Sequence, residues 1–531
     1  MEELNGPDII KYVNGKFDQN VAYNRLVIRE PNLAPKLIQE IIDKSQGVFL
    51  WVRIVVENIL WGIGNNGDNA SESLRRLRAM PPELEPLYEH LLSLIKKRDN
   101  MVWASKAFQI TRAVREFCSE DSAGPIRRDK GSTPLSILML HLALENSDQM
   151  YIVFEGHEDL TPEVLDNACA DAKVRVTARC AGFLEVPTFE RNGASSQIEY
   201  LHRTSRDFLE KKEVWSRLLN ETAQSGFDAH RAMLHAQIRW LSICLSQTVM
   251  YQRIDGIVHR AMLHARYTVD NDDVDVSGEQ ITLTTASLVD ELDALMNREN
   301  EIYDSLTHWT HSFSHDIYGT PLELPPGLEL AGYAALYGLH RYVESKISDA
   351  FDIQLSSSET ETIELEQTTW TKTAASNILH AILRYTQYHT SNDSSIPLVR
   401  PNTVIALLNL GADPNYAPGY TYIDATGHWP LTTWQNMLDF AANHYDAQNM
   451  AANELHTARF TQCFVDIMCE LIDAGAWFDV DDEGMTPELW GWKSIDELVK
   501  ECVIPVFPAA GKRLLKTMQV ARLKRLKREA K

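Results

Sequence analysis

The sequence lacks any apolar run that could cross a lipid bilayer without burying charge. A span needs about 20 apolar residues, and a charge at its centre costs about 2.5–3.5 kcal/mol. The most apolar stretch, GVFLWVRIVVENILWGI at residues 47–63, has 17 residues and carries Arg53 and Glu57 near its middle. These side chains are four residues apart and can pair on one helix face. The stretch therefore predicts a buried or partner-facing helix, and we expect no membrane span.

Cysteine is also scarce, and its arrangement excludes two common structural roles. The seven cysteines are scattered along 531 residues and form no C-x-x-C pair. A disulfide framework or a zinc ribbon needs paired cysteines, so neither is expected. The sequence MEELNGPDII at the start is acidic and lacks the basic-then-apolar order of a signal peptide. These features predict a cytoplasmic protein.

Catalytic motifs are missing as well. The chain has no G-x-S-x-G, no H-E-x-x-H and no motif around a cysteine that would indicate a nucleophile. The densest histidine cluster, HWTHSFSHD, places His308, His311 and His315 at i, i+3 and i+7. Because zinc sites usually offer tighter pairs, we interpret this cluster as an exposed histidine face. The sequence predicts no catalytic residue, no metal ligand, no cofactor and no enzymatic activity.

Positive charge is scarce except at the C-terminus. The net charge of −23 disfavours nucleic acid as the general partner of the chain. The last 20 residues, KRLLKTMQVARLKRLKREAK, hold nine Lys or Arg and one Glu, so the remaining chain carries −31. This basic tail can dock on the acidic body, on RNA or on a membrane surface, or it can form a solvated terminal helix. The sequence leaves these alternatives open.

What is present is a series of helical patterns followed by a short strand-like region. Residues 1–100 have apolar positions at a helical period, broken at Pro81-Pro82. Three further apolar helices are predicted near residues 101–118, 133–145 and 161–181.

Two strand-like runs, FLEV and IEYL, follow these helices and flank a turn-rich stretch with Asn192-Gly193. Helices followed by a hairpin are typical of a winged helix. The wing contains Glu190, Arg191 and Glu199, which are neither basic as a set nor aromatic, so DNA binding is not expected.

Imperfect repeats begin after about residue 324. Helical stretches there end in GADPN and GAWFD, where Gly411 and Gly475 can adopt the left-handed conformation that stops a helix. The two glycines are 64 residues apart, close to two ankyrin periods of about 33 residues. We expect a short, irregular array of helical repeats.

Together, the stretches DIIKYV, KSQGVFLWVRIVVENILWGI, RLRAMPPELEPLYEHLL and YLHRTSRDFL resemble one family. They are similar to the region downstream of the ATPase core in fungal NACHT proteins of the STAND class, which are NLR-like sensors. The resemblance implies a mainly α fold and a C-terminal repeat array. It also implies an ATPase core upstream of residue 1, because no G-x-x-x-x-G-K-[ST] loop occurs in this chain. The chain looks like the C-terminal part of such a protein.

This resemblance and the repeats predict five regions: a helical arm at 1–100, a winged helix at 101–212, a helical linker at 213–323, degenerate ankyrin-like repeats at 324–500, and a basic helix at 501–531. The linker contains an acidic insertion near 270–279.

The resemblance also implies candidate binding residues. His202, in IEYLHRTSRDFL, matches the winged-helix histidine that contacts the β-phosphate of bound ADP in many NACHT proteins. The competing interpretation is that His202 and Asp207 are capping and packing residues, with Thr204 or Ser205 as the helix cap.

The helix at 47–63 is the expected docking surface for a partner protein, including a NACHT ATPase core on another chain. Its contacts would be Phe49, Trp51 and Trp61, and we expect both tryptophans to be partly exposed. The predicted function is a non-catalytic interaction or regulatory module. The alternative is the lid or sensor half of an ATP/ADP-dependent switch.

Overall fold

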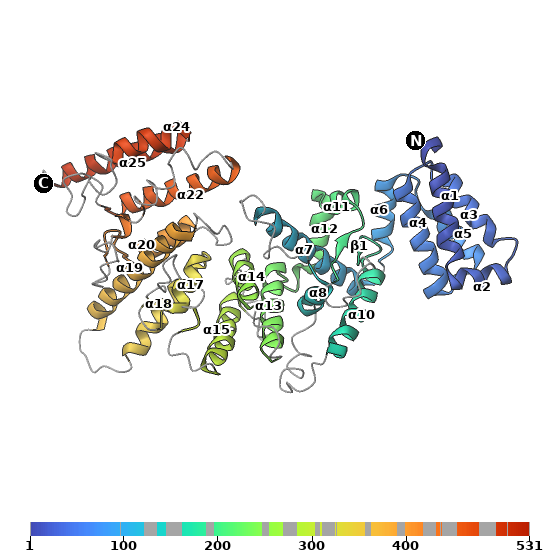
Figure 1. Ribbon diagram of the computed structural model, residues 1–531, viewed down its shortest axis with the longest axis horizontal. Helices are drawn as coiled ribbons and strands as arrows, with labels where there is room; N and C mark the ends of the chain where they lie inside the picture. Colours follow the sequence, from blue (N-terminus) through green and yellow to red (C-terminus); the bar gives the residue numbers. More distant parts are fainter. Residues whose placement is uncertain are drawn as a thin grey trace. The chain divides into compact units, whose positions relative to one another are not determined.

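The computed structural model describes residues 2–95, 97–121, 135–144, 162–186, 196–246, 254–268, 284–302, 308–310, 324, 327–355, 363–389, 399–417, 432–435, 437, 454–476, 495–506 and 508–529. Within these residues the chain is almost entirely helical, which confirms the mainly α fold (Figure 1). Its contacts divide it into two compact units. The first consists of residues 1–114 and 134–229, and the second of residues 115–133 and 230–531.

The first unit begins with helices over the residues predicted as the arm: α1 (Glu2–Asp18), α2 (Val21–Arg29), α3 (Ala34–Lys44), α4 (Phe49–Trp61), α5 (Ala70–Ala79) and α6 (Leu84–Ser93). Local signals fix several of their ends. Asn69 and Glu72 form a reciprocal capping box at the start of α5, and this helix ends just before Pro81. Lys44 of α3 donates hydrogen bonds to the last carbonyls of α5, those of Leu77 and Arg78, where a cation is favoured by the helix dipole.

The glycines that follow Trp61 differ in their effect on α4. Gly62 and Gly64 do not stop the helix, which continues as a π turn over Gly62–Asn66. Gly67 ends it with a φ of 71°, a conformation that glycine adopts without steric cost.

The rest of the first unit contains α7 (Arg98–Asp121) as far as Val114, α8 (Ile137–Leu144), α10 (Pro162–Arg179), β1 (Leu184–Glu185), β2 (Glu199–Tyr200), α11 (Arg203–Leu209) and α12 (Lys212–Ala223). The strands β1 and β2 pair antiparallel, with Leu184 opposite Tyr200. An antiparallel bridge between Ser136 and Gln197 adds a third short segment beside them. The predicted strand-like runs are thus paired, whereas Asn192-Gly193 and the wing residues Glu190 and Arg191 lie outside the described residues.

An aromatic cluster joins the arm to this second part of the first unit. The ring of Tyr88 on α6 lies 5.7 Å from that of Phe183 and 5.5 Å from that of Phe208 on α11. Phe183 also stacks on Phe208 and meets Phe108 of α7 edge to face. Because these rings are buried and come from both predicted regions, residues 1–100 and 101–212 share one core. Helix α12, predicted to belong to the following linker, belongs to this unit.

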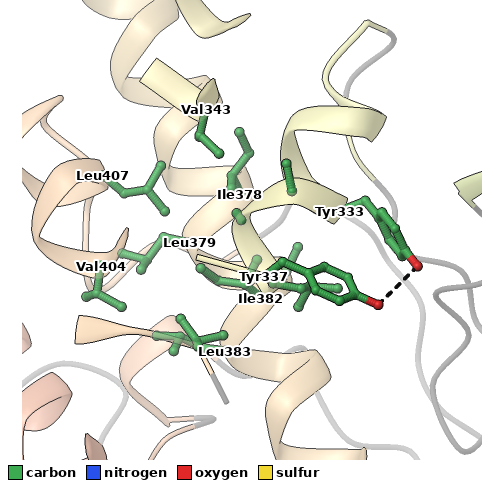
Figure 2. Close-up of a cluster of buried hydrophobic side chains, with 14 of the residues drawn as sticks. Tyr333, Tyr337, Val343, Ile378, Leu379, Ile382, Leu383, Val404 and Leu407 are labelled. Carbon is green, nitrogen blue, oxygen red and sulfur yellow. Dashed lines mark hydrogen bonds between the residues drawn. The ribbon is translucent and has the colours of Figure 1, made fainter. Parts of the chain in front are cut away.

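The second unit contains α13 (Ala229–Ser246), α14 (Ile254–Tyr267), α15 (Thr285–Ile302), α17 (Glu329–Leu336), α18 (His340–Leu355), α19 (Ile363–His389), α20 (Pro401–Asn409), α22 (Glu454–Asp473), α23 (Ile495–Leu498), α24 (Ile504–Val506) and α25 (Pro508–Glu529). One continuous buried cluster runs through them. Figure 2 shows its centre, where side chains of α17, α18, α19 and α20 interdigitate.

Three helices in this unit end in the same way. At each end a glycine with positive φ donates a hydrogen bond to the carbonyl three residues back, and the next residue donates to the carbonyl five residues back, as in a Schellman motif. These glycines are Gly338, Gly411 and Gly475, with φ of 81°, 91° and 101°. The predicted left-handed role of Gly411 and Gly475 is therefore confirmed.

Polar contacts connect the Gly411 turn to two other segments of the second unit. The amide N–H of Asp413, just after the Gly411 turn, donates to Ser376 Oγ of α19 at 2.9 Å. The side chain of Asn415 donates to the carbonyl of Gly475, 60 residues later in the chain, at 3.0 Å. Ser376 thus satisfies a backbone N–H of the Gly411 turn, and Asn415 satisfies a backbone carbonyl of the Gly475 turn.

The basic C-terminal segment is a folded helix, α25, with one face buried and the other exposed to solvent. It packs along α22 (Figure 1), with Leu514 and Met518 fully buried. Three of its cations pair with aspartates of the acidic body: Arg513 with Asp466, Arg522 with Asp496 at 2.6 Å, and Lys524 with Asp473 at 3.1 Å. Of the open alternatives for the tail, docking on the body is the one that the structure contains.

We predict that Gly475→Ala and Gly411→Ala both destabilise the second unit, and Gly411→Ala more strongly. Either alanine has to adopt a positive φ, which costs about 1 kcal/mol or more. A Cβ at Gly475 meets nothing within 4 Å, whereas one at Gly411 lies 2.7 Å from Cγ of Lys372. Urea denaturation of the full chain, followed by circular dichroism, measures the order.

The matched control for both variants is Gly256→Ala. Gly256 is a helical glycine in α14 without a positive φ, so alanine there should be neutral or stabilising. Equal denaturation midpoints for the three variants would contradict the assigned role of the turns.

Candidate partner-binding site

Helix α4 is the centre of the candidate site, and its residues divide between the core and the surface. Val48 starts the helix without a side-chain cap, after Gln46 and Gly47, which both have positive φ. The side chain of Asn5 on α1 donates to the carbonyl of Gly47 at 3.2 Å. This hydrogen bond connects the entry of α4 to α1.

Trp51 corrects the prediction. It is 0% exposed, and its indole N–H donates to the carbonyl of Pro81 at 2.7 Å. The indole is thus part of the core and satisfies a backbone carbonyl between α5 and α6, so it cannot be the partly exposed partner contact that was expected. Trp61, at the other end of α4, is partly exposed as predicted.

Phe49 is a large hydrophobic residue of α4 that is exposed. It is 38% accessible, and its ring lies 5.0 Å from that of Tyr12 on α1. The ammonium of Lys16 lies 5.8 Å from the centre of the Tyr12 ring, within reach of a cation–π attraction.

Around this aromatic pair is a shallow hollow of about 570 Å³, lined by Asn5, Asp8, Lys11, Tyr12, Gly15, Lys16, Gln19 and Phe49. Six of these residues come from one stripe of α1, and Gln19 follows directly after that helix. The hollow therefore combines two aromatic rings with a polar lining that carries two lysines and one aspartate. The prediction identified Phe49 but missed Tyr12 and Lys16, because no local pattern brings residue 12 beside residue 49.

An ionic cluster stabilises the outer face of α4. Arg53 lies 3.6 Å from Glu57 on the same helix and donates to Glu185 of β1, so the pairing expected from the i,i+4 spacing is present. Burial raises the pKa of Glu57, and the nearby Glu185 carboxylate raises it further. The pKa of Arg53 is raised despite partial burial, because of its hydrogen bond and attraction to Glu185.

A second cleft, of about 640 Å³, is lined in part by Trp61 and lies between α4, α5, α6 and the end of α10. Its charged lining is balanced: Glu57, Asp68 and Glu72 are acidic, and Arg75, Arg76 and Lys97 are basic. Asp68 and Arg76 pair at 2.6 Å. Asn58 Oδ1, on the α4 wall of this cleft, is buried and accepts no hydrogen bond from the described part of the chain.

His202 is the cap of α11. Its Nδ1 accepts the N–H of Thr204 at 3.1 Å, and Ser205 Oγ accepts the N–H of His202 at 3.3 Å. The helix cap is thus His202 itself rather than Thr204 or Ser205. Thr204 Oγ1 also shares a hydrogen bond of 2.8 Å with the hydroxyl of Tyr88 on α6, which links the cap to the arm. Asp207 pairs with Arg206 and Arg203 on the same helix.

The predicted histidine cluster is described only at His308, whose ring nitrogens contact neighbouring side chains. His308 Nε2 lies 3.2 Å from Asp293 Oδ1, and its Nδ1 lies 2.8 Å from Thr310 Oγ1. His311 and His315 of the same cluster lie outside the described residues, as does the predicted acidic insertion at 270–279. Among the residues that the structure describes, no group of three His, Cys, Asp or Glu can hold a metal ion.

Burial also determines the reactivity of the buried cysteine thiols. It raises the pKa of Cys169 and Cys463 to about 11, and it raises the pKa of the fully buried Cys180 still further. Since the thiolate is the nucleophilic form, these thiols are poor nucleophiles near neutral pH.

Comparisons with known proteins match only part of the chain. Residues 101–250 match a family described as a domain of unknown function, DUF7791. No curated protein and no solved structure matches the chain. The matched segment contains the paired strands and His202, but it does not include α4 or the hollow at Phe49.

We predict that Arg53→Met destabilises the first unit by about 1 kcal/mol at pH 7. Removing the guanidinium leaves Glu57 and Glu185 facing each other without a counter-ion. The loss should shrink as the pH falls through the carboxylate range, because a protonated pair no longer repels. Thermal unfolding of the full chain between pH 7 and pH 4 measures both effects.

Arg78→Met is the matched control. Arg78 pairs with Glu40, but its side chain is 67% exposed, and exposed ion pairs contribute little. The proposed role of the cluster would be contradicted if Arg53→Met lost no more stability than Arg78→Met, or if its loss of stability did not vary with pH.

Proposed function

We propose that the chain is a non-catalytic protein-interaction and regulatory module, of the kind found beside the ATPase core of NACHT-type STAND sensors. The single observation that supports this most is the hollow around Tyr12 and Phe49. It presents two aromatic rings, one of them 38% exposed, inside a rim of polar and basic side chains.

This arrangement has the composition of an interaction hot spot. Aromatic anchors in a hollow provide most of the binding energy in many interfaces, and the polar rim excludes water. Phe49 is held in place by the left-handed entry to α4 and by Tyr12, so little side-chain entropy is lost on binding. The proposed occupant is a protein that inserts an apolar side chain between the two rings. A NACHT-type ATPase core on another chain is the partner that the sequence resemblance suggests.

The repeat-like helices of the second unit support the same class of function. Helix pairs joined by recurring glycine turns present side chains on a regular surface, and such arrays commonly bind proteins. The degenerate ankyrin-like assignment of residues 324–500 remains part of this proposal.

We predict that Phe49→Asp removes the partners that use the hollow. Proximity labelling with a biotin ligase fused to the full chain in its host cells should recover at least one protein about tenfold less from Phe49→Asp than from wild type. Titration of that purified protein against both chains should reproduce the loss of affinity.

Ile28→Asp is the matched control, because Ile28 is an exposed aliphatic residue of α2, 81% accessible, outside the hollow. It should recover the same proteins as wild type. Identical sets of proteins from wild type, Ile28→Asp and Phe49→Asp would refute the proposed surface.

A second candidate function, the lid or sensor half of a nucleotide switch, is supported by the cap at His202. Nδ1 accepts the Thr204 N–H, so in the neutral imidazole the proton lies on Nε2. The His202 side chain is exposed, and Nε2–H is therefore a donor that a phosphate oxygen can reach. A capping role and a phosphate contact use different nitrogens and are compatible.

We predict for this alternative that the full chain binds ADP in the micromolar range and that His202→Asp abolishes binding. Aspartate can still cap α11 but cannot donate to a phosphate. His202→Ala should also lose binding, and in addition about 1 kcal/mol of stability with the cap. Isothermal titration with ADP separates these outcomes, and absence of binding by the wild-type chain would eliminate the alternative.

A further inference from the structure

Helix α25 has two contrasting faces. The inner face contributes Leu514 and Met518 to the core of the second unit. It also directs Arg513 and Arg522 to Asp466 and Asp496. These contacts fix the helix on α22 and on the segment before it.

The outer face combines aliphatic and basic side chains. Val520, Leu523 and Leu526 are 41%, 58% and 61% exposed, and their spacing of three residues places them on one side of the helix. Exposed on the same side are Lys512, Lys516 and Lys527. The described residues provide no ion pair to these three lysines, in contrast to the paired cations of the inner face.

We propose that this outer face docks on an anionic lipid surface. An amphipathic helix with lysines beside aliphatic residues lies in the interface between headgroups and acyl chains, with the aliphatic residues inserted. The lysine ammonium groups meet the anionic headgroups, and their flexible stems reach past the apolar strip. The charges are complementary, since this face carries lysines and the lipid surface carries phosphate and carboxylate groups.

The acidic body does not prevent this docking. Charges more than about 8 Å apart are largely screened at physiological ionic strength. Three aspartates that contact the helix are already paired, because Asp466, Asp496 and Asp473 bind Arg513, Arg522 and Lys524. The exposed lysines Lys512, Lys516 and Lys527 face solvent.

The residue types favour lipid over RNA. Single-stranded RNA is bound by aromatic rings and arginine planes that stack on bases. Helix α25 contains no aromatic residue. Two of its four arginines, Arg513 and Arg522, pair with aspartates of the body, and its outer strip is aliphatic. No described helix is long and apolar enough to span a membrane, so the contact would be peripheral and reversible.

The test is sedimentation of the full chain with phosphatidylcholine vesicles containing about 30% phosphatidylserine. We expect binding to these vesicles, weak binding to pure phosphatidylcholine, and loss of binding at high salt. Lys516→Glu combined with Lys527→Glu should weaken binding at least about 30-fold. Leu523→Ser combined with Leu526→Ser should also weaken it strongly at unchanged salt dependence.

Matched controls change the same residue types elsewhere. Lys36→Glu with Lys212→Glu alters two exposed lysines of the first unit, and Ile28→Ser with Val174→Ser alters two exposed aliphatic residues. Both controls should bind as wild type, and thermal unfolding should confirm that every variant is folded.

Three outcomes would overturn the proposal: no binding by the wild-type chain, equal binding to both vesicle types, or equal loss in the control variants. Dimers that dissociate in Leu523→Ser/Leu526→Ser, without vesicle binding, would assign the face to a second copy of the chain. None of these results bears on the hollow at Phe49, so this proposal and the proposed function fail separately.

Discussion

The second unit depends on one constraint: no helix pair in it can bury its apolar face alone. Helices such as α17, with seven buried residues in a row from Leu330 to Leu336, need neighbours on several sides. Stacking provides them where the chain reverses tightly, as it does after α17, α20 and α22. The left-handed glycines allow these reversals, and the hydrogen bonds that follow them satisfy carbonyls that would otherwise be buried without partners. The continuous core shown in Figure 2 is a consequence of these turns.

In the first unit, packing and polar contacts act together. Tyr88 contributes its ring to the aromatic cluster and its hydroxyl to Thr204. Arg53 also connects segments that are far apart in sequence, because its ion pair with Glu185 joins α4 to β1. As a result, the cap at His202 and the exposed side of α4 are held by the same body. The two candidate sites are therefore parts of one folded unit, although only one of them lies within the matched family segment.

Much of the fold could be predicted from periodicity and turn residues. The helices near 101–118, 133–145 and 161–181 are present, as are the paired strands and the glycine turns, because these depend on local patterns. The orientation of α4 could not be predicted in the same way. Its sequence is apolar on nearly every side, so no stripe distinguishes the buried Trp51 from the exposed Phe49. That choice is made by Pro81 and Tyr12, which are distant in sequence. The capping role of His202 left a weak local signal, a serine three residues later, as in a capping box.

The aromatic cluster has a consequence for how this protein can be divided. The segment that recurs as a family begins at residue 101, but Tyr88, which contacts Phe183 and Phe208, lies before that boundary. The same segment ends at residue 250, beyond the residue 229 limit of the first unit. The boundaries of the matched family segment therefore differ at both ends from the boundaries of the first folded unit. A fragment cut at the family limits would expose phenylalanine rings at one end and carry an orphaned helix, α13, at the other.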